Sequence, residues 1–272
     1  MESHKSAVDE YFGQVSSYWT SIYDSNTVDG AIYRLREDRV HDWTDSLRLP
    51  ASAPVLEIGC GSGRTTMALA KRGFTVAAID SVESMVDIAT RRVREEGAGN
   101  ATVAVGDACS LNERDRSVRL VIAIGVLPWL ERPADAVCEI ARVLEPGGHA
   151  ILSADNGARL SYLLDPRFNP VSVPAKRLLK RAILRLGLWA NRPETFSRSH
   201  RIGEIDALVA RAGLVKVAGE TVGFGPFTFL GHALLPTRAG LRVHEFLQRL
   251  ADKGVPVLRA GGSNYLVLAR KP

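Results

Sequence analysis

The sequence has few cysteines and no long apolar run. Its 272 residues include three cysteines, Cys60, Cys109 and Cys138, which are far apart and form no CxxC pair. A disulfide framework is therefore excluded, and we expect reduced thiols. No stretch reaches the roughly 18 uncharged apolar residues of a membrane-spanning helix, and no apolar run near the start is typical of a signal peptide. We therefore expect a cytoplasmic protein.

The sequence carries a small and local excess of positive charge. Its net charge is +5 and 46% of its residues are hydrophobic, which predicts one elaborated domain with a principal core. Between Lys176 and Arg201, eight basic residues accompany a single acid, Glu194. Because the excess is local, and because no recognisable RNA-binding module is present, we expect no nucleic-acid partner.

Short β-rich apolar runs alternate with helical segments. This alternation predicts an α/β fold: a Rossmann-like, seven-stranded, mostly parallel sheet with helices on both faces. The expected strands are 55–58, 75–79, 102–105, 120–124, 149–152, 213–221 and 265–269. The expected helices between the first five strands are 65–72, 85–96 and 134–144, and the residues at 145–148 are expected to end the last of these.

Four regions are expected along the chain. About fifty residues rich in aromatics, ending at the breaker-rich stretch Pro50–Pro54, predict a helical N-terminal cap over 1–50. A cofactor-binding core follows at 51–153. Residues 154–212 are too long for a plain crossover and predict a helical lid or substrate insert. Residues 213–272 hold the last two strands, with an aromatic loop and a helix between them.

A glycine-rich turn carries the clearest chemical signal. The string Val55–Arg64 runs from an apolar strand through Glu57 into glycines at 59, 61 and 63, and then opens a helix. Backbone without side chains lets a ligand approach, and the helix N-terminus offers unpaired N–H groups. A dinucleotide fingerprint needs GxGxxG, but here position 64 is Arg, and Glu57 would repel a pyrophosphate. The turn therefore favours a cofactor with a cationic amino group over a nicotinamide or flavin.

On these residues the chain resembles the class I S-adenosylmethionine-dependent methyltransferases. The resemblance covers about residues 53–153 and is to the methyltransferase type 11 group, which includes ubiquinone, menaquinone and magnesium-protoporphyrin methyltransferases. It implies S-adenosylmethionine as cofactor and S-adenosylhomocysteine as product. It places the methionine part at the glycine turn, the ribose hydroxyls on Asp80, and the adenine against Met85 and Asp107. The implied cofactor site comprises Glu57, Gly59, Cys60, Gly61, Gly63, Asp80, Ser81, Met85, Gly106, Asp107, Ala108, Ile124 and Gly125.

For three of these residues, the sequence supports a role in cofactor binding to different degrees. A carboxylate at the tip of the second strand can accept from both ribose hydroxyls, which supports Asp80, although capping of the next helix is an alternative. Met85 suits an adenine face, but a core-facing position is the alternative. Nicotinamide enzymes have no counterpart to Gly106-Asp107-Ala108, so Asp107 discriminates best between the two enzyme classes.

The catalytic base is weakly signalled. Many members of the group carry a histidine after the fourth strand, where this chain has Leu127-Pro128-Trp129. The remaining candidates are Asp155, His200 and His232, which lie in or near the expected substrate cover. Alignment and desolvation alone can also drive methyl transfer, in which case no base is needed.

Aromatic and amphipathic segments indicate the class of acceptor and the residues that bind it. Residues 174–189 form a basic amphipathic pattern, which indicates either a surface helix docked as a lid or a peripheral membrane contact. The loop 223–232 carries three phenylalanines that either line an apolar pocket or pack the lid. These inserts suggest a large, apolar or lipid-linked small-molecule acceptor. The expected acceptor-binding residues are Tyr11, Tyr18, Trp19, Trp129 and Phe227.

The sequence thus predicts methyl transfer from S-adenosylmethionine to a small molecule. The resemblance favours an oxygen acceptor in secondary metabolism or in glycan or lipid tailoring, with nitrogen or carbon as alternatives. A second alternative is a protein that binds S-adenosylmethionine without methylating, in a binding role or to assist a rearrangement. The six histidines and the carboxylates show no metal-ligand spacing, so no metal is expected. The oligomeric state is left open.

Overall fold

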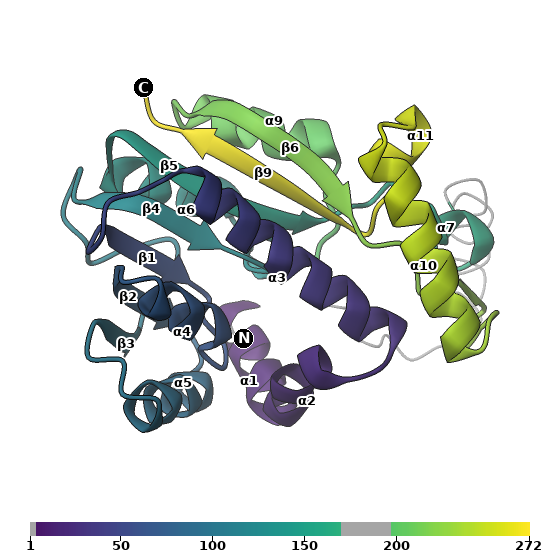
Figure 1. Cartoon of the computed structure of the whole chain (residues 1–272), viewed down its shortest axis with the longest axis horizontal. Helices are drawn as coiled ribbons and strands as arrows, with labels where there is room; N and C mark the ends of the chain where they lie inside the picture. Colours follow the sequence, from purple (N-terminus) through teal and green to yellow (C-terminus); the bar gives the residue numbers. More distant parts are fainter. Residues whose placement is uncertain (1–3, 170–196) are drawn as a thin grey trace, which may run out of the picture.

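A seven-stranded sheet runs through the centre of the molecule (Figure 1). The computed structural model describes residues 4–169 and 197–272. The strand order is β3-β2-β1-β4-β5-β9-β6; the first five strands are parallel, and β9 is antiparallel to both β5 and β6. The predicted fold class is confirmed. The strands are β1 (Pro54–Ile58), β2 (Thr75–Asp80), β3 (Ala101–Val105), β4 (Val118–Ala123), β5 (Leu144–Asp155), β6 (Val215–Val222) and β9 (Asn264–Arg270).

Helices cover both faces of the sheet because successive strand side chains point to opposite sides. In β4, Val121 and Ala123 belong to the core on one face, with α6 and α9. Leu120 and Ile122 belong to the core on the other face, with α3 and α4. Such strands are apolar on both faces, as a buried parallel sheet requires. The helices that flank the sheet are α3 (Val28–Ser46), α4 (Arg64–Lys71), α5 (Glu83–Glu95), α6 (Pro133–Val143) and α9 (Ile202–Arg211).

Helices also occupy the region predicted as an N-terminal cap. They are α1 (His4–Gln14), α2 (Ser16–Ser21), the short 3-10 helix η1 (Ile22–Asp24) and α3. The start of α3 is fixed by Thr27, whose Oγ1 accepts from the Gly30 N–H at 3.1 Å. Helix α3 then runs across the front of the sheet, while α1 and α2 lie near α4 and α5 (Figure 1).

Strand β5 begins earlier than the predicted strand 149–152. Helix α6 ends at Val143, just before residues 145–148, and the backbone from Leu144 onward already belongs to β5. The register between β4 and β5 shifts between Val118 and Leu120, and this shift accommodates the Pro-Gly-Gly stretch. Backbone hydrogen bonds between the glycines at 147 and 148 and Lys271 hold the stretch extended.

The predicted lid or substrate insert at 154–212 includes a helix that belongs to the sheet's own core. Within the predicted insert 154–212, α7 (Ser161–Leu164) follows β5 closely. Helix α9 is a crossover helix of the sheet itself, with Ile205 and Val209 buried in its core. The amphipathic pattern predicted at 174–189 lies outside the described residues. No helix within 4–169 and 197–272 is both long and apolar enough to cross a bilayer.

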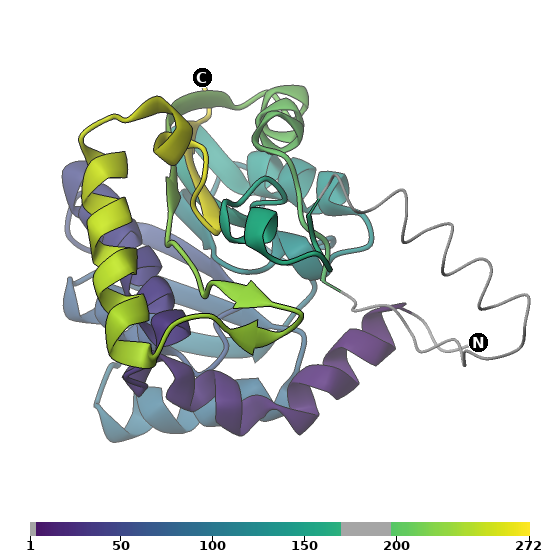
Figure 2. The same cartoon turned by 90° about the vertical axis from the view of Figure 1, so that its right-hand side faces the viewer.

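A hairpin and two helices separate β6 from β9. They are a two-stranded hairpin, β7 (Thr228–Phe229) and β8 (His232–Ala233), then α10 (Thr237–Asp252) and α11 (Pro256–Arg259). Figure 2 shows the hairpin beside the start of α10 and in front of the sheet. The predicted aromatic loop is therefore partly a hairpin.

Candidate functional site

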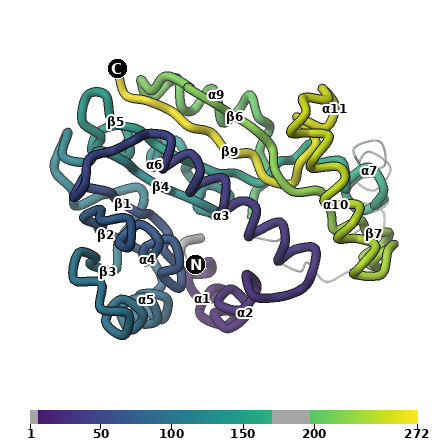
Figure 3. Tube along the Cα trace, in the orientation of Figure 1, coloured from purple at the N-terminus to yellow at the C-terminus, as the bar shows by residue number. Residues whose placement is uncertain are grey.

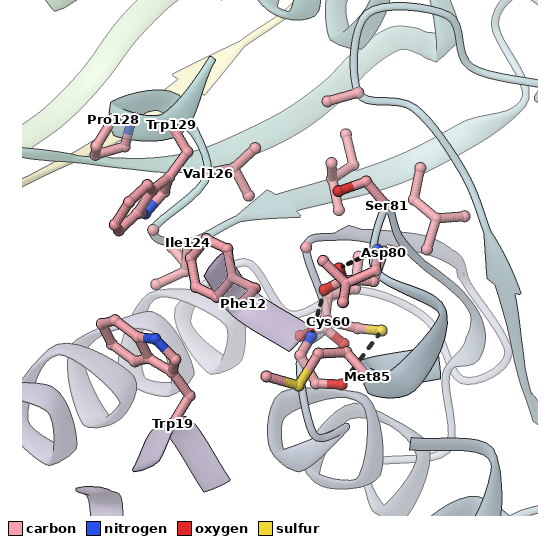
Figure 4. Close-up of a pocket in the computed structure, with 18 of the residues that line it drawn as sticks. Phe12, Trp19, Cys60, Asp80, Ser81, Met85, Ile124, Val126, Pro128 and Trp129 are labelled. Atoms are coloured by element: carbon pink, nitrogen blue, oxygen red, sulfur yellow. Dashed lines mark hydrogen bonds between the residues drawn. The ribbon is translucent and has the colours of Figure 1, made fainter. Parts of the chain in front are cut away.

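A cavity of about 370 Å³ opens at the carboxyl ends of β1, β2 and β4 (Figure 4). Strand β1 lies between β2 and β4, so the strand order reverses here, as at the ligand sites of open α/β sheets. All but one of the predicted cofactor residues line this cavity. Those that do are Glu57, Gly59, Cys60, Gly61, Asp80, Ser81, Met85, Gly106, Asp107, Ala108, Ile124 and Gly125.

The exception is Gly63, which lies in the same turn but outside the lining. It is the N-cap of α4, and a Cβ at this position would come 3.0 Å from the Cβ of Ala89 on α5. This glycine therefore permits α4 and α5 to approach each other.

Gly59 is held in a conformation that other residues rarely adopt. Its φ is +71°, and a Cβ would lie 2.5 Å from Cγ2 of Val126. We expect Gly59→Ala to lower the free energy of unfolding by about 2 kcal/mol or more, because left-handed strain and overpacking add. Urea unfolding measures this change. Gly61→Ala is the matched control, since Gly61 has φ +50° but open space around it. An equal loss in both variants would show that Val126 does not matter.

Asp80 bridges, through hydrogen bonds, the glycine turn after β1 and the turn between β2 and α5. Its Oδ2 accepts from the Gly61 N–H at 2.8 Å and its Oδ1 accepts from the Val82 N–H at 3.0 Å. Burial raises the pKa of this carboxyl, and the two backbone hydrogen bonds act in the opposite direction. Each carboxylate oxygen can accept further hydrogen bonds, so Asp80 can bind hydroxyls of a ligand as well.

The N-terminal helix α1 reaches this end of the cavity. Ser81 Oγ donates to Asp9 Oδ1 at 2.7 Å, and Asp9 lines the cavity with Val8 and Phe12. The sequence reasoning missed Asp9, because nothing in the local pattern around it indicates contact with a residue 72 positions later.

Glu57 lies buried beneath the glycine turn. Thr66 Oγ1 donates to its carboxylate, and burial raises the pKa of Glu57 to about 8. The folded chain then binds a proton between pH 4.5 and 8 that the unfolded chain has lost. The charged form is thus disfavoured in the folded protein without a ligand.

This shift predicts a pH dependence of stability. As the pH rises from about 5 to 8, Glu57 should lower the free energy of unfolding by at most about 1.4 kcal/mol per unit. We expect Glu57→Gln to remove this slope, whereas the exposed control Glu95→Gln keeps it. Urea titrations of the ligand-free proteins at several pH values measure the slope; if the slope survives in Glu57→Gln, another group causes it.

Residues after β2 and β3 form the end of the cavity where the adenine ring is expected. Met85 is buried and also lines the cavity, so the two readings of this residue are compatible. Gly106 lies against Ile79, where a Cβ would come within 2.9 Å of the isoleucine Cβ. The Cys109 N–H donates to Asp107 Oδ1 at 2.9 Å, which fixes the turn after β3.

A buried arginine, which the sequence did not indicate, lines the cavity away from the expected adenine end. Arg36 Nη1 donates to Asn264 Oδ1 at 3.0 Å and Nη2 donates to the Tyr23 hydroxyl at 3.1 Å. Its guanidinium lies 4.7 Å from the ring centroid of Tyr33. Within the described residues, its Nε is buried without a hydrogen-bond partner. The available signal was its place on the buried face of α3, four residues from both Ile32 and Val40.

Arg36 is thus a buried cation with neutral partners. It is 6% exposed and, within the described part of the chain, it forms no ion pair with a carboxylate. The negative charge of Asp155 acts on Arg36 without forming an ion pair with it, and burial of a charge without a counter-ion in contact is costly. This arrangement fits a site that receives an anionic group of a ligand.

Aromatic side chains form one wall of the cavity. Phe12, Trp19 and Trp129 line it and lie close together in Figure 4, and the Phe12 and Trp129 ring centroids are 4.7 Å apart. Tyr11 stacks on Trp129 at 5.5 Å without lining the cavity. Among the other predicted acceptor residues, Tyr18 is 48% exposed and lies outside the lining, as does Phe227.

The three candidate bases lie in different places. Asp155 ends β5 and lines the cavity, and Ser197 Oγ donates to its Oδ2 at 3.3 Å. His200 bonds the Asp155 carbonyl through its backbone N–H, but its side chain is not part of the lining. His232 is exposed in the hairpin. Within the described residues, no cluster of His, Cys, Asp or Glu is arranged to hold a metal ion.

Sequence comparison matches part of the chain to one domain family and to several relatives. The profile of the methyltransferase domain family matches residues 56–152. An uncharacterized methyltransferase of Mycobacterium tuberculosis is 38% identical over 109 residues, which are 39% of this chain and 40% of that protein. The chain therefore covers about two fifths of that relative's length. A ubiquinone biosynthesis O-methyltransferase of Hydrogenovibrio crunogenus is 24% identical over 79% of this chain and 82% of its own length.

Solved structures share the fold over nearly the whole chain. The magnesium protoporphyrin IX methyltransferase of Synechocystis with bound SAH superposes with a TM-score of 0.66 and 20% identity, covering 98% of this chain and 100% of that one. A [4+2]-cyclase superposes with a TM-score of 0.56 and 20% identity, covering 86% of this chain and 80% of that one. At this level of identity, these likenesses establish the fold.

Proposed function

We propose that this protein, whose residues 56–152 form a class I S-adenosylmethionine-dependent methyltransferase domain, transfers a methyl group from S-adenosylmethionine to an oxygen atom of a small molecule. The second product is S-adenosylhomocysteine. The observation that carries the proposal is the layout of the cavity. The glycine turn and Asp80 lie at one end, and an aromatic wall with Asp155 lies at the other.

The cavity residues fit this cofactor. Asp80 can accept from the ribose hydroxyls while it keeps its backbone hydrogen bonds. Arg36 would hold the methionine carboxylate, which supplies the anion that its buried guanidinium lacks. Met85 would lie against the adenine ring.

The chain's own residues would then align and shield the reacting groups. Bound S-adenosylmethionine supplies an electrophilic methyl group on a sulfonium. Phe12, Trp19 and Trp129 exclude water from the acceptor end, and their ring faces favour a cationic centre nearby. Asp155 accepts the proton that the acceptor hydroxyl loses as the new carbon–oxygen bond forms. A Cβ at Gly125 would come 3.4 Å from Arg36 Nη1, so this glycine leaves room for the guanidinium.

The acceptor should be apolar or carry a large apolar part. The cavity wall at the acceptor end consists of aromatic rings, and Pro128 continues it from the loop after β4. Trp19 Nε1 is buried there without a partner in the described part of the chain, so it can donate to an acceptor oxygen. These contacts suit a phenol, an enol or a carboxylic acid on an apolar scaffold.

The test is transfer of a labelled methyl group. Purified protein, S-adenosylmethionine labelled in its methyl group, and a panel of phenols, carboxylic acids and amines would be incubated together. We expect label in an oxygen acceptor, and turnover lowered by about 100-fold or more in Asp155→Asn, with unchanged binding of S-adenosylhomocysteine. The exposed Asp87→Asn is the charge-matched control.

Three other outcomes would count against parts of the proposal. Label found only in amines or carbon acids would replace the oxygen acceptor. Equal turnover in Asp155→Asn would remove the base and leave alignment as the mechanism. Cofactor that is bound but never consumed, whatever the acceptor, would indicate a binding protein or a rearrangement catalyst. Calorimetry with NADH provides the negative control for the cofactor site.

A further inference from the structure

We propose that the β7–β8 hairpin and α7 together form a docking surface for an anionic lipid bilayer. This surface, the hairpin surface, is separate from the cavity, and the proposal does not depend on methyl transfer. Its apolar members are all exposed: Leu163, Leu164, Phe168, Phe229, Leu230, Leu234 and Leu235.

The exposure of these side chains is unusual. Every residue from 229 to 238 is exposed, and Phe229, Leu230 and Leu234 are 47%, 56% and 49% exposed. The hairpin and α7 lie side by side at one end of the molecule (Figure 3), and Figure 2 shows the same neighbours from another side. Large apolar groups gathered at one place on a surface mark an interaction site more often than scattered ones do.

A buried carboxylate holds the hairpin in place. Asp165, directly after α7, accepts from Thr228 Oγ1 at 2.7 Å, from the Gly231 N–H at 3.3 Å and from Arg167 Nη2 at 2.8 Å. These hydrogen bonds keep the pKa of Asp165 far below its usual range. The turn at Leu230 and Gly231 is tight, with φ values of +49° and +92°. The apolar tip is therefore held outward by specific bonds to α7.

The exposed charges within the two segments of the hairpin surface are basic, and the next acid along α10 is the exposed Glu245. From Thr221 to His244 the sequence has no Asp or Glu, while Arg238 and Arg242 are exposed and one helical turn apart. On the α7 side, the one acid between 156 and 169 is Asp165, which is buried and paired with Arg167. Apolar side chains with a basic rim are the pattern of a segment that lies in the interface of an anionic membrane.

The chemistry of the surface favours a bilayer over a protein partner. Protein interfaces are enriched in aromatic residues, Met and Arg, and they also carry about one hydrogen bond per 100–200 Å². The hairpin surface offers leucines and phenylalanines with cations beside them and no exposed acid between 226 and 242. A bilayer needs no matched polar pairs, since its headgroups adapt to the cations and its acyl region accepts the apolar side chains.

Sedimentation with vesicles tests the proposal. Full-length protein would be mixed with vesicles of phosphatidylcholine alone, or of phosphatidylcholine and phosphatidylglycerol in equal parts. We expect the protein to pellet with the anionic vesicles, and the partition coefficient to fall by roughly ten-fold or more in Phe229→Ser/Leu230→Asn. Asparagine is chosen because it tolerates the left-handed conformation at position 230. Arg238→Gln/Arg242→Gln should also weaken binding, and added salt should do the same.

A matched double variant supplies the control. Val215 and Val217 are 58% and 56% exposed on β6, away from the hairpin, so Val215→Ser/Val217→Ser should pellet as the wild type does. Thermal unfolding would establish that each variant is folded. The proposal is overturned if the wild type stays in the supernatant, if it pellets equally with neutral vesicles, or if the hairpin variant binds as well as the control. Self-association that is lost in the hairpin variant would instead make this surface an interface between copies.

Discussion

Replacing Asp80 by alanine is expected to weaken the binding of S-adenosylhomocysteine by about 100-fold or more. Two hydrogen bonds from ribose hydroxyls to a carboxylate would be lost, each contributing about 1.5–3 kcal/mol. The variant also loses the bonds that Asp80 makes to the backbone N–H groups of Gly61 and Val82, so the glycine turn would be less well ordered. Both effects act in the same direction.

Calorimetry with both forms of the cofactor measures this loss. Asp87→Ala removes the same charge from an exposed position of α5 and should leave the affinity unchanged. Asp80→Asn keeps the size of the side chain, but its NH₂ group would oppose one of the two backbone donors, so we expect an intermediate loss. If Asp80→Ala bound as tightly as the wild type, the cofactor would not lie where we place it.

Arg36→Gln is expected to weaken the binding of S-adenosylhomocysteine by about 30-fold or more, because a buried charge pair with the ligand carboxylate would be lost. The size of the effect follows from the burial of the guanidinium, which removes the competing water. A glutamine can still donate to Asn264 or to the Tyr23 hydroxyl, so part of the local hydrogen bonding survives.

A second ligand separates this role from a structural one. The nucleoside 5′-methylthioadenosine has the same adenosine and sulfur but no amino-acid end, so its affinity should be the same in the wild type and Arg36→Gln. Equal weakening of both ligands would mean that Arg36 supports the cavity without binding the carboxylate. Arg34→Gln, from the same helix, is the control, since Arg34 bonds backbone carbonyls of the N-terminal segment.

The fold was predictable because its signals are local in sequence. Apolar runs of four to six residues mark the strands, and the turn at residues 59–63 marks the point where the first strand meets a helix. Residues 56–152, which include this turn, match the methyltransferase domain family. The start of β5 was missed because proline and glycine usually end elements, and only a register shift in the sheet allows them here.

The acceptor end was less predictable because distant segments build it. Arg36 and Phe12 come from N-terminal helices, Trp129 from the loop after β4, and Asp155 from the end of β5. Aromatic residues near position 20 could be recognised as a group, but not which of them would face the cavity. Trp19 lines it and its neighbour Tyr18 does not. His200 and His232 were candidates because they lie in or near the expected substrate cover, and their side chains lie outside the cavity lining.

The hydrogen bond between Arg36 and Asn264 joins residues 228 positions apart. During synthesis, Arg36 leaves the ribosome long before β9 exists, so the glycine turn can form while the guanidinium still lacks its amide partner. A growing chain therefore has a nucleotide half-site but no complete pocket. Asn264 lies on β9, which pairs with both β5 and β6, so the hydrogen bond of Arg36 to this amide requires that β9 has been inserted between its two neighbours.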